Sequence, residues 1–174
     1  MNNKPNLNDI ITTEIATPIG PLLAAASNKG LCLLEFMDRK NLEAQLNQLK
    51  KYFSANIIAG TSPFLGELSP QLLEYFNGKR KVFNVPLDVP ATDFQTKVWL
   101  ALQTIPYGKT VSYQTQAIAI ENPKAVRAVA KANSANRIAI IIPCHRVIGK
   151  DGSMTGYAGK IWRKEYLLEL EANN

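Results

Sequence analysis

The chain has 174 residues, of which 46% are hydrophobic and 20% are charged, and its formal net charge is +6 at pH 7. This apolar content is sufficient for a buried core in one domain or in two small ones. No apolar run approaches the length of a membrane span, and the first nine residues are polar without a signal-peptide pattern. We therefore expect a soluble, cytoplasmic protein that does not bind membranes.

The cysteine and histidine content argues against a metal site. Cys32 and Cys144 lie far apart, and the chain has only one histidine. That leaves neither a disulfide framework nor a set of zinc ligands, so we expect no metal. Cys32 falls in an apolar run, and we interpret it as a core residue without chemistry.

Three short runs rich in apolar and β-branched residues open the chain, and turn residues separate them. They predict an antiparallel meander with strands over 10–16, 22–26 and 31–36. Apolar residues at helical spacing then predict a helix over 40–54 that packs on the sheet, and a second helix over 70–77.

Charge is divided unevenly along the chain. Residues 92–174 carry eleven basic and six acidic residues, a net charge of +5, whereas the first 91 residues carry nine and eight, a net charge of +1. A basic half is the electrostatic footprint of a partner with a phosphate backbone. An ordinary solvated basic surface is the alternative interpretation. The stretch 84–90 contains two prolines and no helical pattern, so it is the expected connection between the halves.

The second half predicts mainly helices. Thr92 is a suitable N-cap for a helix that ends near Ile105, Ser112 for a helix over 113–120, and Pro123 for the first position of a third helix. The last two, joined by a tight turn, form a helix-turn-helix pattern. Its second helix has cations at helical spacing and a side of small residues, which together suit contact with DNA: Lys124, Arg127 and Lys131, and Ala125, Ala128 and Ala132. A final helix is predicted over 160–172.

The most informative stretch, 141–149, holds Cys144 and His145 side by side between apolar residues. A thiol becomes a strong nucleophile as the thiolate, and a neighbouring imidazole can take its proton. Adjacent side chains on an extended strand point to opposite faces. The pair can therefore cooperate only if Pro143 turns the backbone or if a water molecule bridges the two groups.

Eight segments together resemble the O6-alkylguanine-DNA alkyltransferases. They are 94–99, 105–108, 112–114, 123–129, 132–136, 142–147, 156–159 and 167–171. The resemblance covers nearly all of 92–172 and, more weakly, the N-terminal part. It implies an α+β fold in which a small N-terminal α/β domain with antiparallel strands, 1–88, has a supporting role. A mostly helical, catalytic and DNA-binding helix-turn-helix domain, 89–174, follows it.

The family's activity implies that an alkyl group passes from O6-alkylguanine in duplex DNA irreversibly to Cys144, once per molecule, with O4-alkylthymine as a further candidate substrate. His145, oriented by Glu171, would draw the thiol proton, and Tyr113 would protonate the leaving base. Asn136 would fix the active-site turn. Arg127 would replace the extruded base in the stack. No cofactor is needed, and the partner is double-stranded DNA containing alkylated guanine, bound by a monomer.

The resemblance also assigns residues that bind DNA and line the alkyl pocket. The DNA-binding set is Arg127, Tyr113, Gln114, Asn122, Lys124, Ala125 and Lys150, and the pocket set is Val147, Tyr157 and Ala158. Two positions depart from the family pattern. Ala158 replaces a serine or arginine, so that only its backbone N–H can contact O6, and Lys160 replaces a second glycine.

Two other functions stay open at this point. A lesion-binding module related to these proteins would bind alkylguanine without repairing it, but in such modules the acceptor cysteine is replaced, whereas Cys144 is present here. A hydrolase using Cys144, His145 and Glu171 would turn over repeatedly. Such enzymes normally have the histidine far from the cysteine in sequence, so adjacency disfavours this reading.

Overall fold

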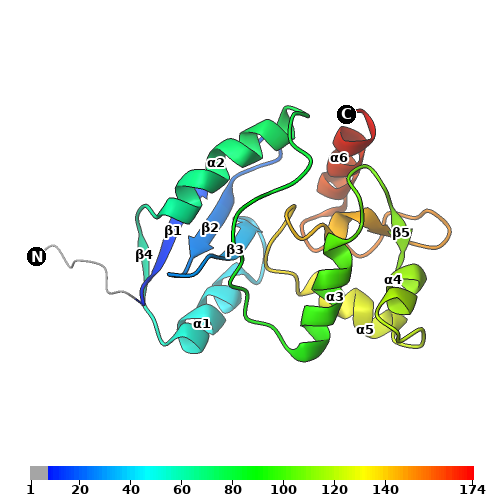
Figure 1. Ribbon diagram of the computed structural model, residues 1–174, viewed down its shortest axis with the longest axis horizontal. Helices are drawn as coiled ribbons and strands as arrows, with labels where there is room; N and C mark the ends of the chain where they lie inside the picture. Colours follow the sequence, from blue (N-terminus) through cyan, green and yellow to red (C-terminus); the bar gives the residue numbers. More distant parts are fainter. Residues whose placement is uncertain (1–7) are drawn as a thin grey trace, which may run out of the picture. The chain divides into compact units, whose positions relative to one another are not determined.

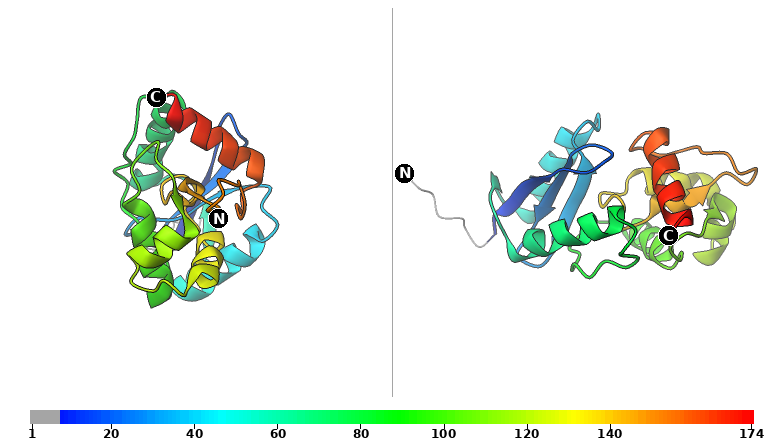
Figure 2. Two further views of the ribbon diagram at one scale, coloured as in Figure 1. Left: turned by 90° about the vertical axis from the view of Figure 1, so that its right-hand side faces the viewer. Right: turned by 90° about the horizontal axis from the view of Figure 1, so that it is seen from above.

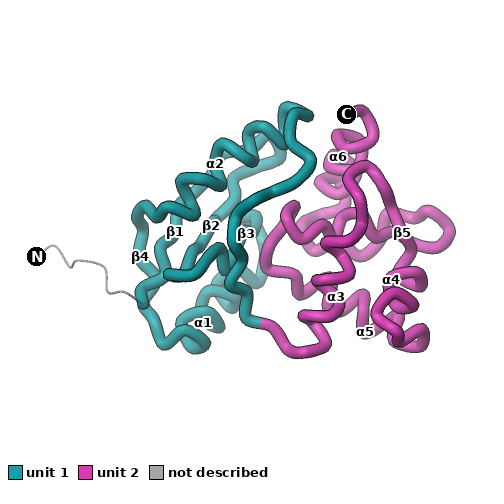
Figure 3. Tube along the Cα trace, viewed as in Figure 1, with its two compact units in different colours: residues 1–90 teal, residues 91–174 magenta. Residues whose placement is uncertain are grey.

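A computed structural model describes residues 8–174, which form two compact units divided between Pro90 and Ala91 (Figure 3). Unit 1 contains a sheet with two helices, and unit 2 is mainly helical. Within residues 8–174, no helix has the length and apolar character needed to cross a membrane, and no cluster of side chains could hold a metal ion.

The sheet of unit 1 has four strands in the order β3-β2-β1-β4. The expected meander is present as β1 (Ile10–Ile15), β2 (Leu22–Ala26) and β3 (Leu31–Phe36), which pair antiparallel. Strand β4 (Ile57–Ala59) was not predicted; it pairs parallel to β1 and makes the sheet mixed. Every residue of β3 is buried, as expected for a strand covered on both faces.

Helices α1 (Leu42–Phe53) and α2 (Pro63–Phe76) lie on opposite faces of this sheet (Figures 1 and 2). The prediction of a helix over 70–77 was wrong at its start. Ser62 is the N-cap, and its hydroxyl accepts from the Leu65 amide at 3.3 Å. The start was misplaced because Pro70 is a typical first helical residue, whereas here it lies inside the helix.

The proline-containing connection is tied to the edge of the sheet. The Leu31 amide donates to the Pro86 carbonyl at 2.8 Å, and the Asp88 amide donates to the Leu31 carbonyl at 2.9 Å. Gly30 is required for this close approach, because a Cβ at that position would lie 2.5 Å from the Pro86 oxygen. The segment therefore covers part of β3 before the chain enters unit 2.

Unit 2 begins with α3 (Asp93–Gln103), which has the expected cap at Thr92. The helix-turn-helix consists of α4 (Tyr113–Ala119) and α5 (Val126–Ser134). Helix α5 starts at Val126, so the prediction that Pro123 is its first residue was wrong. Residues 122–125 form a turn instead, in which the Ala125 amide donates to the Asn122 carbonyl at 3.0 Å, and Lys124 lies outside the helix.

The remaining elements of unit 2 surround the Cys-His pair. Two short parallel strands, β5 (Val111–Ser112) and β6 (Val147–Ile148), join the start of α4 to the segment that follows the pair. A single 3₁₀ turn, η1 (Cys144–Arg146), precedes β6, and α6 (Ile161–Ala172) ends the fold. The left-hand view of Figure 2 faces α4 and α5, with α6 crossing above them.

Candidate active site

The backbone turns at Pro143, as cooperation between Cys144 and His145 requires. Pro143 has φ −84° and ψ 63°, and the Cys144 amide donates to the Ile142 carbonyl at 2.8 Å. These values describe an inverse γ-turn. The chain then enters η1, so the two side chains do not lie on opposite faces of a strand. His145 is fully buried, and Cys144 is partly accessible.

Asn136 holds the loop that leads to this turn. Its amide nitrogen donates to the carbonyls of Ile138 at 3.3 Å and Ile142 at 2.8 Å, and it lies 3.3 Å from Cys144 Sγ. Its amide oxygen accepts from the Ile138 N–H at 3.0 Å. Between these anchors Ile140 has φ 71°, a conformation that a β-branched residue adopts only under strain. The amide clamp therefore holds a strained loop behind the thiol.

Behind His145 lies a buried carboxylate. His145 Nε2 lies 2.7 Å from Glu171 Oε1, and both side chains are inaccessible to solvent. Glu171 also accepts from Arg146 Nε at 2.8 Å, from Arg146 Nη2 at 3.0 Å and from the Gly108 N–H at 3.1 Å. Arg146 Nη1 donates to the Ile105 carbonyl at 2.6 Å. Glu171 is thus shared between the histidine and a bidentate arginine.

These contacts determine the protonation of the pair. Although burial opposes ionisation, the bonds from His145 and Arg146 hold the pKa of Glu171 far below its usual range. Burial lowers the pKa of His145, an effect that Glu171 opposes and the charge of Arg146 reinforces. A neutral His145 must donate through Nε2 to the ionised carboxylate, which leaves Nδ1 as an acceptor. Among the described residues, Nδ1 has no hydrogen-bond partner.

Tyr113 also lies near the thiol of Cys144. Burial and the nearby Cys144 raise the pKa of Tyr113, so the phenol keeps its proton at neutral pH. Its hydroxyl donates to the Thr155 carbonyl at 2.9 Å. Gly156 packs so closely that a Cβ would lie 2.6 Å from this hydroxyl. A small residue at 156 is therefore needed to leave room for the phenol.

Lys164 is a buried cation within the same site. Its Nζ donates to the carbonyls of Val147 at 2.5 Å and Thr155 at 2.9 Å, and it lies 5.9 Å from the centre of the Tyr113 ring. Burial lowers its pKa, whereas the nearby Cys144 acts in the opposite direction. Lys164 joins β6 to the loop that passes over Tyr113.

No role was predicted for Arg146 or Lys164 from the sequence. The motif at 142–147 includes Arg146, but arginine and lysine side chains usually lie at the protein surface, so its burial was not expected. The burial of Lys164 could have been inferred from helical spacing. Lys164, Leu167 and Glu171 lie on the same face of α6, and this face is buried. At the start of α6, the apolar residues Ile161 and Trp162 are exposed.

The residues assigned to DNA contact lie mostly on the surface of the helix-turn-helix. Arg127, Asn122, Lys124 and Gln114 are exposed, and the Gln114 side chain donates to the Pro123 carbonyl at 3.0 Å. Ala125 is half-buried in the turn. The small face was expected to include Ala132, which is instead buried, and its carbonyl accepts from the Trp99 indole at 2.9 Å.

The three pocket residues and Lys150 lie in the segment between η1 and α6. Val147 is buried, Tyr157 is half-buried, and Ala158 and Lys150 are exposed. Lys160, which replaces a glycine of the family pattern, has φ 77°. A non-glycine residue at this φ is strained, so lysine in place of glycine at this position raises the conformational energy of the backbone.

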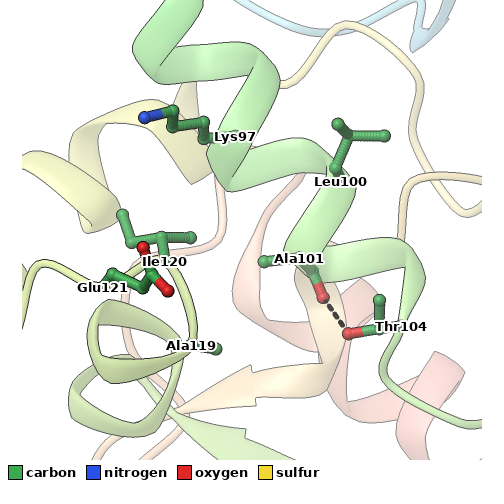
Figure 4. A pocket seen from close by; sticks show the side chains of 7 residues that line it. All are labelled: Lys97, Leu100, Ala101, Thr104, Ala119, Ile120 and Glu121. Atoms are coloured by element: carbon green, nitrogen blue, oxygen red, sulfur yellow. Dashed lines mark hydrogen bonds between the residues drawn. The ribbon is translucent and has the colours of Figure 1, made fainter.

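A surface pocket of about 360 Å³ lies elsewhere in unit 2, between α3 and the C-terminal end of α4 (Figure 4). Lys97 reaches it from α3, and Glu121 from the turn after α4. The Thr104 hydroxyl donates to the Ala101 carbonyl at 2.8 Å on its wall. None of the residues assigned above to catalysis, DNA contact or the alkyl pocket lines it.

Two protein families match the chain, one in each unit. Residues 10–89 match the ribonuclease-like domain of 6-O-methylguanine DNA methyltransferase, and residues 93–173 match the DNA-binding domain of the same protein. The two matched regions meet at the connection between the units.

Individual proteins give the same result over nearly the whole chain. A methylated-DNA–protein-cysteine methyltransferase of Methanosarcina barkeri is 47% identical over 163 residues, which cover 92% of this chain and 96% of that protein. A constitutive one from Bacillus subtilis is 53% identical over 160 residues, covering 91% and 93%. The crystal structure of Mycobacterium tuberculosis OGT in complex with DNA has a TM-score of 0.78 at 42% identity and covers 95% and 93%.

Proposed function

The chain belongs to the 6-O-methylguanine DNA methyltransferase family, and we propose that it repairs DNA by moving the alkyl group of O6-alkylguanine irreversibly onto its own Cys144. One observation carries the assignment of residues. A partly accessible thiol follows a tight turn beside a buried neutral histidine, which has an ionised carboxylate on one nitrogen and an unpartnered acceptor on the other.

The first step is extrusion of the damaged nucleotide, which costs about a few kcal/mol of lost stacking and pairing. Arg127 offsets this cost by occupying the vacated place in the duplex. Its exposed position on α5 supports this role, as does the basic charge of residues 92–174.

The second step is transfer. The thiol proton of Cys144 passes to His145 Nδ1, through a bridging water as in the family, and Glu171 stabilises the resulting imidazolium. The thiolate forms a bond to the alkyl carbon as the bond from that carbon to O6 breaks. Tyr113 gives its proton to the departing guanine, and return of the proton from His145 restores both side chains. A thioether on Cys144 has no good leaving group, so each molecule acts once.

The substrate and setting follow from the same site. We propose double-stranded DNA with alkylated guanine as the partner, O4-alkylthymine as a second candidate substrate, and action as a monomer. Unit 1 supports the catalytic unit and supplies none of the reacting groups. A reducing cytoplasm suits a protein that depends on a free thiol.

The proposal is tested with a duplex that contains O6-methylguanine labelled in the methyl group. Mass spectrometry of the digested protein should find one label per molecule, on the peptide that contains Cys144. Label on Cys32 would contradict the proposal. So would repeated demethylation of the duplex by a protein that itself acquires no label. Cys32→Ala is the matched control, since that thiol is buried and lies 3.3 Å from the Ala25 carbonyl.

A further inference from the structure

The first helix of the helix-turn-helix buries few of its side chains in unit 2. Only Gln116 and Ala117 of the seven residues of α4 are buried, and Ile118 is 59% exposed. Beyond Ala119, the open pocket separates the end of α4 from α3 (Figure 4). Helices normally take their direction from an apolar stripe, whereas Ala117 is the one apolar side chain of α4 that is fully buried. Another interaction must set its direction.

A reciprocal pair of amides provides that interaction. Gln116 Nε2 donates to Asn133 Oδ1 at 3.0 Å, and Asn133 Nδ2 donates to Gln116 Oε1 at 2.7 Å. Gln116 Nε2 also lies 3.3 Å from the Val98 carbonyl of α3. Both side chains are almost fully buried, with 2% and 4% of their surface exposed. The pair therefore joins α4 to α5 and to α3 through hydrogen bonds between buried polar atoms.

Such a pair constrains geometry more tightly than apolar contacts do. Both bonds form at only one separation and one relative orientation of the two amides. A shift of either helix leaves buried donors and acceptors unpaired, which is costly. Apolar side chains of similar volume would tolerate the same shift with little loss. Buried polar pairs can therefore fix how two helices meet, as they fix register in coiled coils.

We propose that Gln116 and Asn133 are positioning residues for DNA repair, because their amide pair sets the angle at which α5 meets α4 and so presents Arg127 to the duplex. The proposal rests on the proposed function of Arg127 in base extrusion. Arg127 is exposed on α5, six residues before Asn133, so a change of angle at the pair displaces it. Neither amide contacts Cys144, His145 or Glu171 in the hydrogen bonds described.

The test compares Gln116→Leu, Asn133→Leu and the double variant, with Gln103→Leu as a matched control. Gln103 is an exposed glutamine of α3 whose amide bonds only within its own helix, to the Trp99 carbonyl at 3.3 Å. Four quantities are measured for each protein. They are the melting temperature, the single-turnover rates with free O6-benzylguanine and with a duplex containing O6-methylguanine, and the affinity for undamaged duplex.

Each single variant should melt about 3–10 °C lower, because one amide remains buried without its partner. The double variant should regain most of this loss, because neither amide remains. Its reaction with free O6-benzylguanine should match that of the wild type. Its reaction with duplex and its affinity for duplex should stay lower by about threefold or more. Gln103→Leu should change none of the four.

The proposal is overturned if the double variant regains its melting temperature and also keeps duplex reaction and duplex affinity within about twofold of wild type. If the leucine pair does not fold, the near-isosteric Gln116→Glu and Asn133→Asp remove donors without changing shape. The ratio of duplex to free-base rates then decides in the same way. If the wild type transfers no label, the proposed function fails, whereas affinity for undamaged duplex still tests the amide pair.

Discussion

His145 and Glu171 show how unequal surroundings divide roles between two neighbouring side chains. Glu171 accepts three N–H groups besides that of His145, so it stays ionised. His145 is buried beside two cations, Arg146 and Lys164, so it stays neutral. A neutral imidazole with one nitrogen committed to a carboxylate is a base ready for a proton.

The thiol should supply chemistry and little binding. We expect Cys144→Ala to abolish alkyl transfer and to leave affinity for duplex DNA near wild type, because Sγ adds almost no contact area. Mass spectrometry and fluorescence anisotropy with labelled duplex measure the two quantities. Cys32→Ala should retain both, and transfer remaining in Cys144→Ala would show that the nucleophile is another residue.

Glu171→Gln should move the pH dependence of transfer. Without the anion, the imidazole becomes a weaker base and helps less to remove the thiol proton of Cys144. A higher pH is then needed to form the thiolate, so the midpoint of the rate should shift to higher pH. Single-turnover transfer from free O6-benzylguanine across pH 6–9 measures the shift. Glutamine also leaves Arg146 without its buried counter-ion, so the melting temperature should fall, and the rates must be compared well below it.

The exposed Glu169 lies on the same helix and provides the control for this experiment. Glu169→Gln should leave the pH profile unchanged. A shift in Glu169→Gln together with an unshifted Glu171→Gln would mean that a different carboxylate supports the histidine.

At the level of helices and strands, α5 should act on duplex DNA and hardly at all on a free base. We expect Arg127→Ala to slow repair of O6-methylguanine in duplex far more than reaction with free O6-benzylguanine, because only the duplex requires extrusion. Comparison of the two single-turnover rates measures the effect. Lys97→Ala, on α3, removes a cation that lines the surface pocket and should change neither rate. Equal losses on both substrates would show that Arg127 supports the fold.

The elements that were predictable are those with a strong local signal. Strands β1 to β3 are apolar runs between turns, and α3 has a capping box at Thr92. Strand β4 has three residues, and β5 and β6 have two each, so their pairing depends on distant partners and leaves no periodicity. The first half of α2 was missed because Pro70 is tolerated inside a helix that its apolar face holds in place.

The residues of the site likewise differ in how strong a local signal they leave in the sequence. The Cys144–His145 pair stands out because adjacent reactive side chains in an apolar run need an explanation. Glu171 was placed through the resemblance, since sequence alone favours an exposed terminal charge. Arg146 and Lys164 could not be placed, because their burial depends on carbonyl and carboxylate groups distant in the chain, among them Ile105, Val147 and Glu171.

For the whole molecule, the low pKa of His145 predicts loss of stability in acid. In the unfolded chain the imidazole has its ordinary pKa of about 6.5, whereas in the folded chain the pKa of His145 is lower because the side chain is buried. The unfolded state thus holds more protons, and stability should fall as pH drops below about 6.5. Glu171 adds a loss in the same direction below its ordinary value of about 4.3. Burial raises the pKa of Glu35 in unit 1, so protonation of this residue favours the folded state as pH falls and opposes the other two effects.

Tryptophan fluorescence reports the unfolding of unit 2, because the only two tryptophans of the chain, Trp99 and Trp162, both lie in unit 2. The melting temperature of the fluorescence transition should be lower at pH 5.5 than at pH 7.5. His145→Gln should show a smaller difference between these two conditions. A transition that is unchanged or higher at pH 5.5 would contradict the expected protonation of the buried pair.

The segment that covers β3 has a consequence for how the chain leaves the ribosome. Strand β3 is complete at Phe36, but Pro86 and Asp88, whose backbone bonds to Leu31 cover its edge, are made about fifty residues later. Until then, the nascent sheet presents an open edge that can pair with other chains. At a synthesis rate of about 5–20 residues per second, this exposure lasts roughly three to ten seconds. Conditions that slow elongation over residues 37–88 should therefore favour aggregation of the newborn protein before Cys144 has been made.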